Sequence, residues 1–327
     1  MSGSSLPRDG MAASPDVSVI IVSYNSEHLL PRSLGALQAG RGPLRLQVIV
    51  VDNGSRDRSV EMLKRDFPQV ELIDNAANLG FGRANNQALS RARGRYILLL
   101  NPDAFVSPDT LPKTIGFMDS HPRCGVLGVK LVEENGAIQP SAFRFPTPWN
   151  IFLQASRFDW LLGRASLAQQ RDDDGAHPCD WVRGCFYLVR REVIEAAGLF
   201  DPRYFLYYEE VDHCRSLRGT PWEVMYYPGT KVIHLGGESA KLGGGVLDGS
   251  QQVSALHAES ELLYFRKHHG VIGVLASVFL TSLVDLGRAL KRVAVLHDGR
   301  LALAALSHLR LELGLLIKTA IGSRPLH

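Results

Sequence analysis

Polar side chains follow three apolar segments of this 327-residue sequence, each at the point where the apolar run ends. These clusters are Ser23-Tyr24-Asn25, Asp52-Asn53-Gly54-Ser55 and Asn101-Pro102-Asp103. Carboxylate and carbonyl oxygens, such as those of Asp103 and Asn101, are the ligands that Mg²⁺ and Mn²⁺ prefer in proteins. Asn-Pro-Asp is also good turn chemistry, so one cluster alone would indicate no more than a turn. Three clusters at corresponding strand ends favour a built site.

A second constellation is the adjacent acid pair Glu209-Glu210, with Asp212 two residues further on. Neighbouring carboxylates raise each other's pKa by repulsion, which suits a general base. A solvated helix start is the alternative, because acidic residues complement the helix dipole there. Aromatic residues at 204, 205, 207 and 208 surround the acids with apolar surface and favour the catalytic interpretation.

Alternating strands and helices must position these side chains. Apolar runs predict strands at 17–22, 46–51, 70–73 and 96–100, and helices at 27–39, 57–66 and 78–92 between them. Such alternation predicts a parallel sheet covered on both faces, and ligands bind at the carboxyl edge of such sheets. Later strand-like segments are 125–132, 181–194 and two short strands within 223–234. The aromatic-rich segment 144–178 is interpreted as a flexible substrate lid.

Composition and missing motifs exclude several classes of protein. No GxGxxG follows the first strand and no GxxxxGK[ST] occurs, which argues against a dinucleotide-binding oxidoreductase and a P-loop NTPase. The four cysteines show no CxxC pair or metal-ligand spacing and indicate reduced thiols in a cytosolic compartment. Residues 1–15 are small and polar, which predicts a disordered leader. A net charge of +3 gives no reason to expect a nucleic-acid partner.

The region after residue 250 has helical composition and carries the positive charge. The run 271–284 has fourteen uncharged, mostly apolar residues, too few to span a bilayer, with basic residues on both sides. This arrangement suits a helix lying on an anionic membrane surface. A helical hairpin packed on the core or against another subunit fits equally well, and a weaker apolar pattern recurs at 301–322.

Seven segments, in order, resemble family 2 glycosyltransferases, which are inverting enzymes with a GT-A fold. They are VSVIIVSYN, VIVVDNGSRD, NLGFGRANNQAL, LLLNPDA, WVRGCFYLVRR, YFLYYEEVDHCRSLR and VIHLGGES. The rhamnosyltransferase-like branch is the most similar. The resemblance implies a Rossmann-like, mostly parallel sheet at 16–245, with a nucleotide-sugar half (16–120) and an acceptor half (121–245). Residues 246–327 would form a helical region that contacts a membrane surface or a second subunit.

The resemblance also implies a role for each motif. The residues that would bind the nucleotide-sugar donor are Ser23, Tyr24, Asn25, Asp52, Asn78, Gly80, Phe81, Asn85, Asn101 and Arg215, with Arg183 as an alternative to Arg215. The metal would be held by Asp103, Asn101 and His234, although a lone histidine can also be structural. Trp181 and Gly184 would form the acceptor floor, and Glu210 would be the base, with Glu209 or Asp212 as alternatives. Asn101 and Glu210 stand where the family more often has Asp.

We therefore expect a Mn²⁺- or Mg²⁺-dependent transfer of rhamnose from dTDP-rhamnose to a glycan or polyprenyl-diphosphate-linked acceptor, in cell-surface polysaccharide synthesis. Other donors, UDP-galactofuranose or UDP-GlcNAc, and an inactive nucleotide-sugar-binding protein are the alternatives. The expected location is the cytoplasm, with the protein peripheral on the inner face of the cell membrane. A homo-oligomer formed through the C-terminal helices is an alternative use of those helices.

Overall fold

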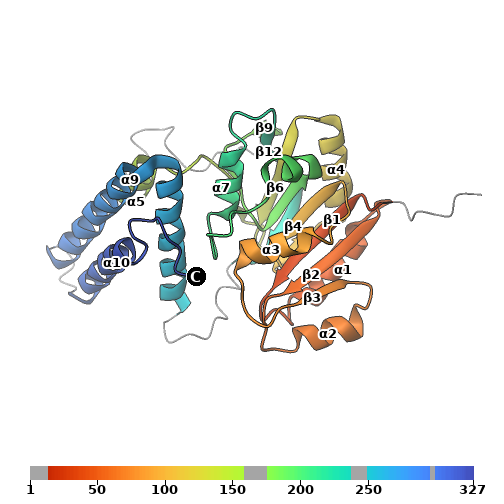
Figure 1. Cartoon of the computed structure of the whole chain (residues 1–327), viewed down its shortest axis with the longest axis horizontal. Helices are drawn as coiled ribbons and strands as arrows, with labels where there is room; N and C mark the ends of the chain where they lie inside the picture. Colours follow the sequence, from red (N-terminus) through yellow and green to blue (C-terminus); the bar gives the residue numbers. More distant parts are fainter. Residues whose placement is uncertain (1–13, 158–174, 237–248, 295–298) are drawn as a thin grey trace, which may run out of the picture.

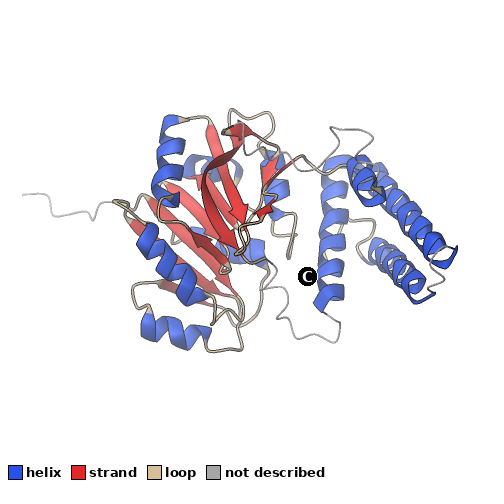
Figure 2. Ribbon diagram, turned by 180° about the vertical axis from the view of Figure 1, so that it is seen from behind, coloured by secondary structure: helices blue, strands red, loops and turns tan. Residues whose placement is uncertain are grey.

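The computed structural model describes residues 14–157, 175–236, 249–294 and 299–327 (Figure 1). An α/β part is followed by a helical C-terminal region that stands beside it (Figures 1 and 2). The predicted fold class, a sheet flanked by helices with a C-terminal helical region, is confirmed.

Within the described residues, ten strands form one sheet, whose main order is β3-β2-β1-β4-β11-β6-β12-β5. These strands are β1 (Val17–Ser23), β2 (Leu46–Asp52), β3 (Glu71–Asp74), β4 (Tyr96–Leu100), β5 (Ala104–Val106), β6 (Cys124–Val132), β7 (Ile138–Gln139), β9 (His177–Pro178), β11 (Phe186–Arg190) and β12 (Glu223–His234). Strands β1 to β4 run parallel, with Val19 opposite Val48 of β2 and Leu98 of β4. Their carboxyl ends, which carry the three polar clusters, therefore meet at one edge of the sheet.

The acceptor half of the sheet is less regular than the sequence predicts. Strand β11 runs antiparallel between β4 and β6, and β5 runs antiparallel to β12. The prediction of two short strands at 223–234 is wrong, because the segment is one strand that pairs with β6 on both sides of a register shift between Tyr227 and Lys231. Pro228 and Gly229 thus make an irregularity in a strand that continues. Strands β8 (Ala142–Phe143) and β10 (Trp181–Val182) form a small separate pair.

Helices cover both faces of the sheet because its central strands are apolar on both sides. All five residues of β4 are at most 1% exposed. One hydrophobic cluster joins the sheet to α1 (Leu30–Gly40), α2 (Ser59–Asp66) and α4 (Thr110–Ser120). The other cluster joins it to α3 (Phe81–Leu89), α6 (Arg191–Ala197) and α7 (Glu209–Ser216).

The C-terminal region consists of α9 (Gly249–Ala294) and α10 (Gly299–Lys318), which pack against each other. Gly270 divides α9 with a non-helical backbone (φ 67°, ψ −167°). Before this kink, Leu263, Tyr264 and Phe265 are at most 1% exposed and belong to the same hydrophobic cluster as β1 and α3. The core therefore runs without a break from the sheet into the first half of α9.

The segment predicted as a lid is placed elsewhere, as far as it is described. Residues Pro148–Ser156 form helix α5, which begins with a capping box between Thr147 and Asn150 and packs against α9. The apolar residues of α5 thus pack against the C-terminal region, and α5 contributes no residue to the cavity described below. Residues 158–174 lie outside the described part of the chain.

Candidate active site

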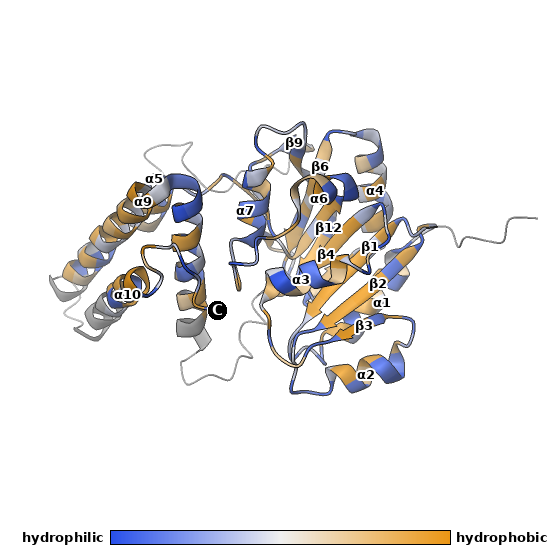
Figure 3. Ribbon diagram, viewed as in Figure 1, coloured by the Kyte–Doolittle hydropathy of each residue, from blue (hydrophilic) through white to orange (hydrophobic). Residues whose placement is uncertain are grey.

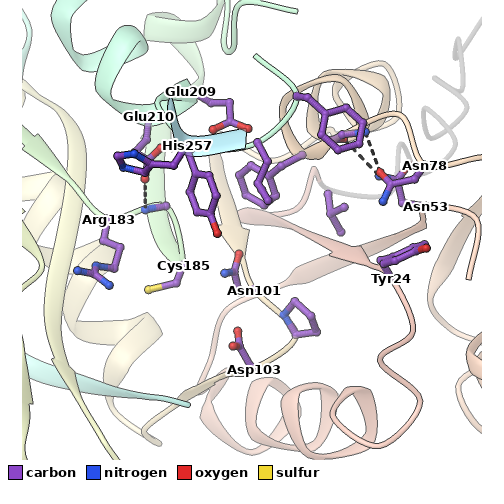
Figure 4. A pocket seen from close by; sticks show the side chains of 18 of the residues that line it. Tyr24, Asn53, Asn78, Asn101, Asp103, Arg183, Cys185, Glu209, Glu210 and His257 are labelled. Atoms are coloured by element: carbon purple, nitrogen blue, oxygen red, sulfur yellow. Dashed lines mark hydrogen bonds between the residues drawn. The ribbon is translucent and has the colours of Figure 1, made fainter. Parts of the chain in front are cut away.

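A cavity of about 530 Å³ opens at the carboxyl ends of β1, β2 and β4 (Figure 4). Eleven of the residues predicted for the site line it: Tyr24, Asn78, Gly80, Phe81, Asn101, Asp103, Trp181, Gly184, Glu209, Glu210 and His234. They come from both halves of the α/β part, and the chain brings them together at the edge where parallel strands end.

Asn53, which the sequence placed in a polar cluster without a role, organises the end of the cavity near Tyr24. Its amide nitrogen donates to Asn78 Oδ1 at 2.8 Å and to the Gly80 carbonyl at 3.3 Å, and its Oδ1 accepts from Leu79 N. Gly80 has φ 86°, and a Cβ there would lie 2.4 Å from the Phe205 carbonyl oxygen. This loop therefore requires glycine at position 80, and Asn53 holds it in place.

Five residues predicted to contact the donor do not line the cavity: Ser23, Asn25, Asp52, Asn85 and Arg215. Asn25 and Asp52 fix the loops after β1 and β2, because Asn25 N donates to Ser55 Oγ and Ser55 N donates to Asp52 Oδ1, both at 2.9 Å. Burial raises the pKa of Asp52. Asn85 Nδ2 donates to the Phe81 carbonyl and so ties α3 to its first turn.

Three potential metal ligands converge at the other side of the cavity. Asn101 Oδ1 and Asp103 Oδ1 are buried and accept no hydrogen bond from the described residues. His234 Nε2 lies 3.7 Å from Asp103 Oδ1. Buried oxygens without a donor are costly unless a cation or water satisfies them, so these residues fit a divalent ion.

Gln139, on β7, sets the protonation of this histidine. Its amide nitrogen donates to the His234 carbonyl at 2.9 Å, which leaves Oε1 to accept from His234 Nδ1 at 2.8 Å. Nδ1 therefore carries the proton and the lone pair of Nε2 faces Asp103, the orientation seen in histidines that bind metals. Burial lowers the pKa of His234, which keeps the ring neutral. No sequence pattern indicated Gln139.

A second group of potential ligands, Asp285, His308 and Glu312, lies between α9 and α10 and borders no part of the cavity. His308 Nδ1 donates to Asp285 at 2.7 Å, and Arg288 lies 3.6 Å from the same carboxylate. Burial raises the pKa of Glu312 to about 8. With Arg288 and His308 beside one carboxylate, this group is a polar contact between helices.

Glu209 and Glu210 enter the cavity from the first turn of α7. Glu210 Oε1 accepts from Gly184 N at 3.2 Å, whereas Glu209 is 1% exposed and its Oε1 has no partner among the described residues. Burial raises the pKa of both carboxyls, and the charge of Glu210 raises that of Glu209 further. The backbone immediately before them is strained, since Tyr207 and Tyr208 have φ of 72° and 69°. Such conformations cost about 1–3 kcal/mol each.

Asp212 and Arg215, also on α7, point away from the cavity. Asp212 is 2% exposed and accepts from Lys267 at 2.7 Å and His268 at 2.6 Å, both on α9. The Arg215 guanidinium lies over the Phe145 ring at 5.1 Å. Arg183 lines the cavity instead, and so does His257 of α9, a residue that the sequence gave no reason to select.

A comparison with protein-family models matches residues 18–195 to "Glycosyl transferase family 2". The chain belongs to this family. Among curated proteins, an N-acetylglucosaminyl-diphospho-decaprenol L-rhamnosyltransferase of Mycobacterium tuberculosis is 27% identical over 270 residues, covering 77% of this chain and 85% of the relative. A poly(ribitol-phosphate) β-N-acetylglucosaminyltransferase of Staphylococcus aureus is 28% identical over 48% of this chain and 28% of its own length.

Among solved structures, a mannosyltransferase from Pyrobaculum calidifontis, in complex with GDP-Man and Mn²⁺, aligns with a TM-score of 0.53 at 17% identity. The alignment covers 95% of this chain and 88% of the mannosyltransferase. At this identity the likeness concerns the fold, and it agrees with the GT-A fold that the motifs imply. This family 2 member is therefore a glycosyltransferase, as the sequence predicts.

Proposed function

We propose that this glycosyltransferase moves rhamnose from dTDP-rhamnose, with inversion, to a sugar on a polyprenyl diphosphate. The observation that carries the reaction type is the presence of Glu210 in the same cavity as Asn101 and Asp103. The choice of donor and acceptor is supported by the relative that covers most of the chain, an N-acetylglucosaminyl-diphospho-decaprenol L-rhamnosyltransferase.

The donor nucleotide is proposed to lie between Tyr24 and the Asn53-Asn78-Gly80 loop, with its diphosphate toward Asp103 and Arg183. Asp103, Asn101 and His234 would hold Mn²⁺ or Mg²⁺, which would neutralise charge on the leaving diphosphate. Arg183 adds a fixed positive charge on the same side. Trp181 and Gly184 are proposed to form the floor on which the acceptor sugar rests.

Glu210 is proposed to take the proton of the acceptor hydroxyl. The hydroxyl oxygen then bonds to the anomeric carbon while the bond from that carbon to the diphosphate oxygen breaks, and the electron pair leaves with the nucleoside diphosphate. The Gly184 N–H fixes one carboxylate oxygen of Glu210, which leaves the other free to accept a proton. The raised pKa of Glu210, caused by burial, strengthens it as a base.

A donor screen tests this proposal. Nucleoside diphosphate release is followed with Mn²⁺ and a short-chain N-acetylglucosaminyl diphospholipid, using dTDP-rhamnose, UDP-galactofuranose and UDP-GlcNAc. We expect acceptor-dependent release with dTDP-rhamnose. Release with another donor only would reassign the sugar, and binding of donors without any release would identify a binding protein that lacks catalysis.

We further propose that the C-terminal helices rest on the inner face of the cell membrane, which would make this a peripheral cytoplasmic enzyme. Apolar residues lie exposed on one stripe of α9: Ile272 (82%), Leu275 (48%), Phe279 (62%), Leu283 (45%), Leu286 (47%) and Leu290 (62%). Leu313 (44%) and Ile317 (80%) of α10 are exposed as well, and Figure 3 shows apolar residues along much of α9 and α10. The opposite side of α9 packs on α10, as in a helix lying in an interface.

By length and composition, residues Val253–Lys291 of α9 could also cross a bilayer, because an 18-residue window within them has a mean hydropathy of 1.9. A third of that window is buried. The kink at Gly270 and the packing of the first half favour surface attachment. Flotation with vesicles of anionic and of neutral lipid tests it: the protein should float with anionic vesicles, and an Ile272→Ser/Phe279→Ser variant should not. If the protein forms a stable dimer and does not bind vesicles of either composition, the stripe would instead be the contact surface for a second copy of this chain.

A further inference from the structure

The C-terminal region contributes to the cavity itself. His257, on the first half of α9, is exposed and lines the cavity together with Glu209 and Glu210. Its ring lies 5.5 Å from that of Tyr207 and 5.3 Å from that of Tyr208. Figure 4 shows His257 at the end of the cavity that holds the two glutamates, away from Tyr24 and Asn78. His257 thus lies on the side opposite the proposed nucleotide site.

The same face of α9 holds the strained backbone before the glutamates. Ser260 Oγ donates to the Leu206 carbonyl at 2.8 Å, and Tyr208 Oη donates to Glu261 Oε2 at 3.2 Å. Tyr264 packs against Tyr208 with ring centroids 5.2 Å apart. His257, Ser260, Glu261 and Tyr264 recur at i, i+3, i+4 and i+7, so one stripe of a single helix makes all of these contacts.

All of these contacts are with one short segment, residues 206–208. Two consecutive tyrosines in the left-handed region persist only where surrounding groups over-determine them. Here the surrounding groups come from α9, and the residue that follows the second tyrosine is Glu209. Any relaxation of Tyr207 and Tyr208 would therefore move both carboxylates of α7.

We propose that this stripe of α9 builds the acceptor side of the active site. His257 donates a hydrogen bond to an acceptor oxygen beside the hydroxyl that Glu210 deprotonates, and Ser260 and Glu261 are positioning residues for the glutamate pair. The ligand class is an oxygen-rich acceptor, contacted through either a sugar hydroxyl or a diphosphate oxygen. The proposal rests on the proposed function, because it takes Glu210 as the base.

Steady-state transfer by the full chain tests the role of His257. His257→Ala should raise KM for the acceptor about tenfold, the worth of one hydrogen bond, while the donor Kd from calorimetry stays unchanged. His257→Gln keeps a donor group and should recover part of the loss. His121, an exposed histidine that stacks on Phe117 outside the cavity, supplies the matched control, and His121→Ala should behave as wild type.

Two acceptors separate the sources of the contacted oxygen: an N-acetylglucosaminyl diphospholipid and a neutral alkyl N-acetylglucosaminide. If His257 contacts the diphosphate, His257→Ala loses its effect on the neutral acceptor; if it contacts the sugar, both acceptors are affected. An unchanged acceptor KM for both, in an enzyme that transfers normally, would overturn the role of His257. Failure of the proposed function looks different, because wild-type protein would then release no nucleoside diphosphate with either acceptor.

Glu261 is tested by comparing kcat with KM. Glu261→Gln keeps an oxygen that accepts from Tyr208, whereas Glu261→Ala does not. We expect Glu261→Ala to lower kcat at least tenfold with little change in donor Kd, and Glu261→Gln to restore most of it. If both variants lose kcat equally, or if Glu261→Ala loses only thermal stability and keeps its kcat, α9 does not position the glutamates.

Discussion

Replacing Glu210 with glutamine is the change that tests the chemistry most directly. Glutamine has the same shape and keeps an oxygen that can accept the hydrogen bond from Gly184 N, which lies 3.2 Å from Glu210 Oε1. The cavity and the donor site should therefore be preserved. What the variant loses is the ability to accept the acceptor's proton, so kcat should fall by about 10²–10⁴, or about 2.7–5.4 kcal/mol of transition-state stabilisation.

Glu209→Gln is the matched control for this experiment. Burial and the neighbouring Glu210 charge raise the pKa of Glu209 well above its ordinary value, which favours the neutral carboxylic acid. Glutamine imitates a neutral carboxylic acid closely. We therefore expect Glu209→Gln to retain most of the wild-type kcat, although the two residues are adjacent and both line the cavity.

The assay combines transfer rates over a range of pH with donor binding by calorimetry. The base must be ionised, and burial raises the pKa of Glu210, so the wild-type rate should rise with pH through that raised value. This rise of the transfer rate with pH should disappear in Glu210→Gln, while the donor Kd stays within the error of the wild-type value. A near-normal rate in Glu210→Gln, or a large loss confined to Glu209→Gln, would refute the assignment of the base.

Three further changes follow from the site and the C-terminal helices. Gln139→Leu removes the acceptor that fixes His234 Nδ1 and should weaken Mn²⁺ binding about 10–100-fold by calorimetry; an unchanged Mn²⁺ Kd would exclude His234 as an oriented ligand. Gly80→Ala places a Cβ 2.4 Å from the Phe205 carbonyl at φ 86°, so donor affinity and Tm should both fall, and retention of both would mean that the loop can move away. Glu312 has its pKa raised by burial from 4.5 to about 8, so the folded state keeps a proton that the unfolded state releases, and stability falls as pH rises through this window. Glu312→Gln should therefore gain up to about 1.4 kcal/mol over wild type for each pH unit between these values, and parallel stability curves would contradict the buried neutral acid.

Periodicity accounts for what could be predicted from the sequence. The apolar runs of β1, β2 and β4 indicate strands covered on both sides, and the polar residues at their ends reach the cavity at Tyr24, Asn101 and Asp103. The loops between strands are harder to predict. Asn25 and Asp52 are polar residues of the types that often bind ligands, yet in the structure they form hydrogen bonds with the turn around Ser55.

Helix geometry explains the placement of Asp212. An α-helix turns about 100° per residue, so Asp212 lies about 200° from Glu210 around α7 and faces the opposite side. If α7 is predicted to begin at Glu209, this geometry argues against Asp212 as an alternative base. His257 and Gln139 could not be predicted this way, since their roles depend on how α9 and β7 pack against distant parts of the chain.

The buried contacts of Asp212 limit how this enzyme can be divided or recombined. Cutting the chain before α9 would remove Lys267 and His268 and leave a 2%-exposed carboxylate without its ammonium and imidazole partners. Removing one partner of a buried ion pair costs about 3–5 kcal/mol, a large share of the stability of an ordinary domain. A chimera that grafts these helices onto another glycosyltransferase would have to carry the facing residues of α7 with them. The two regions should therefore be exchanged and inherited together, as one evolutionary unit.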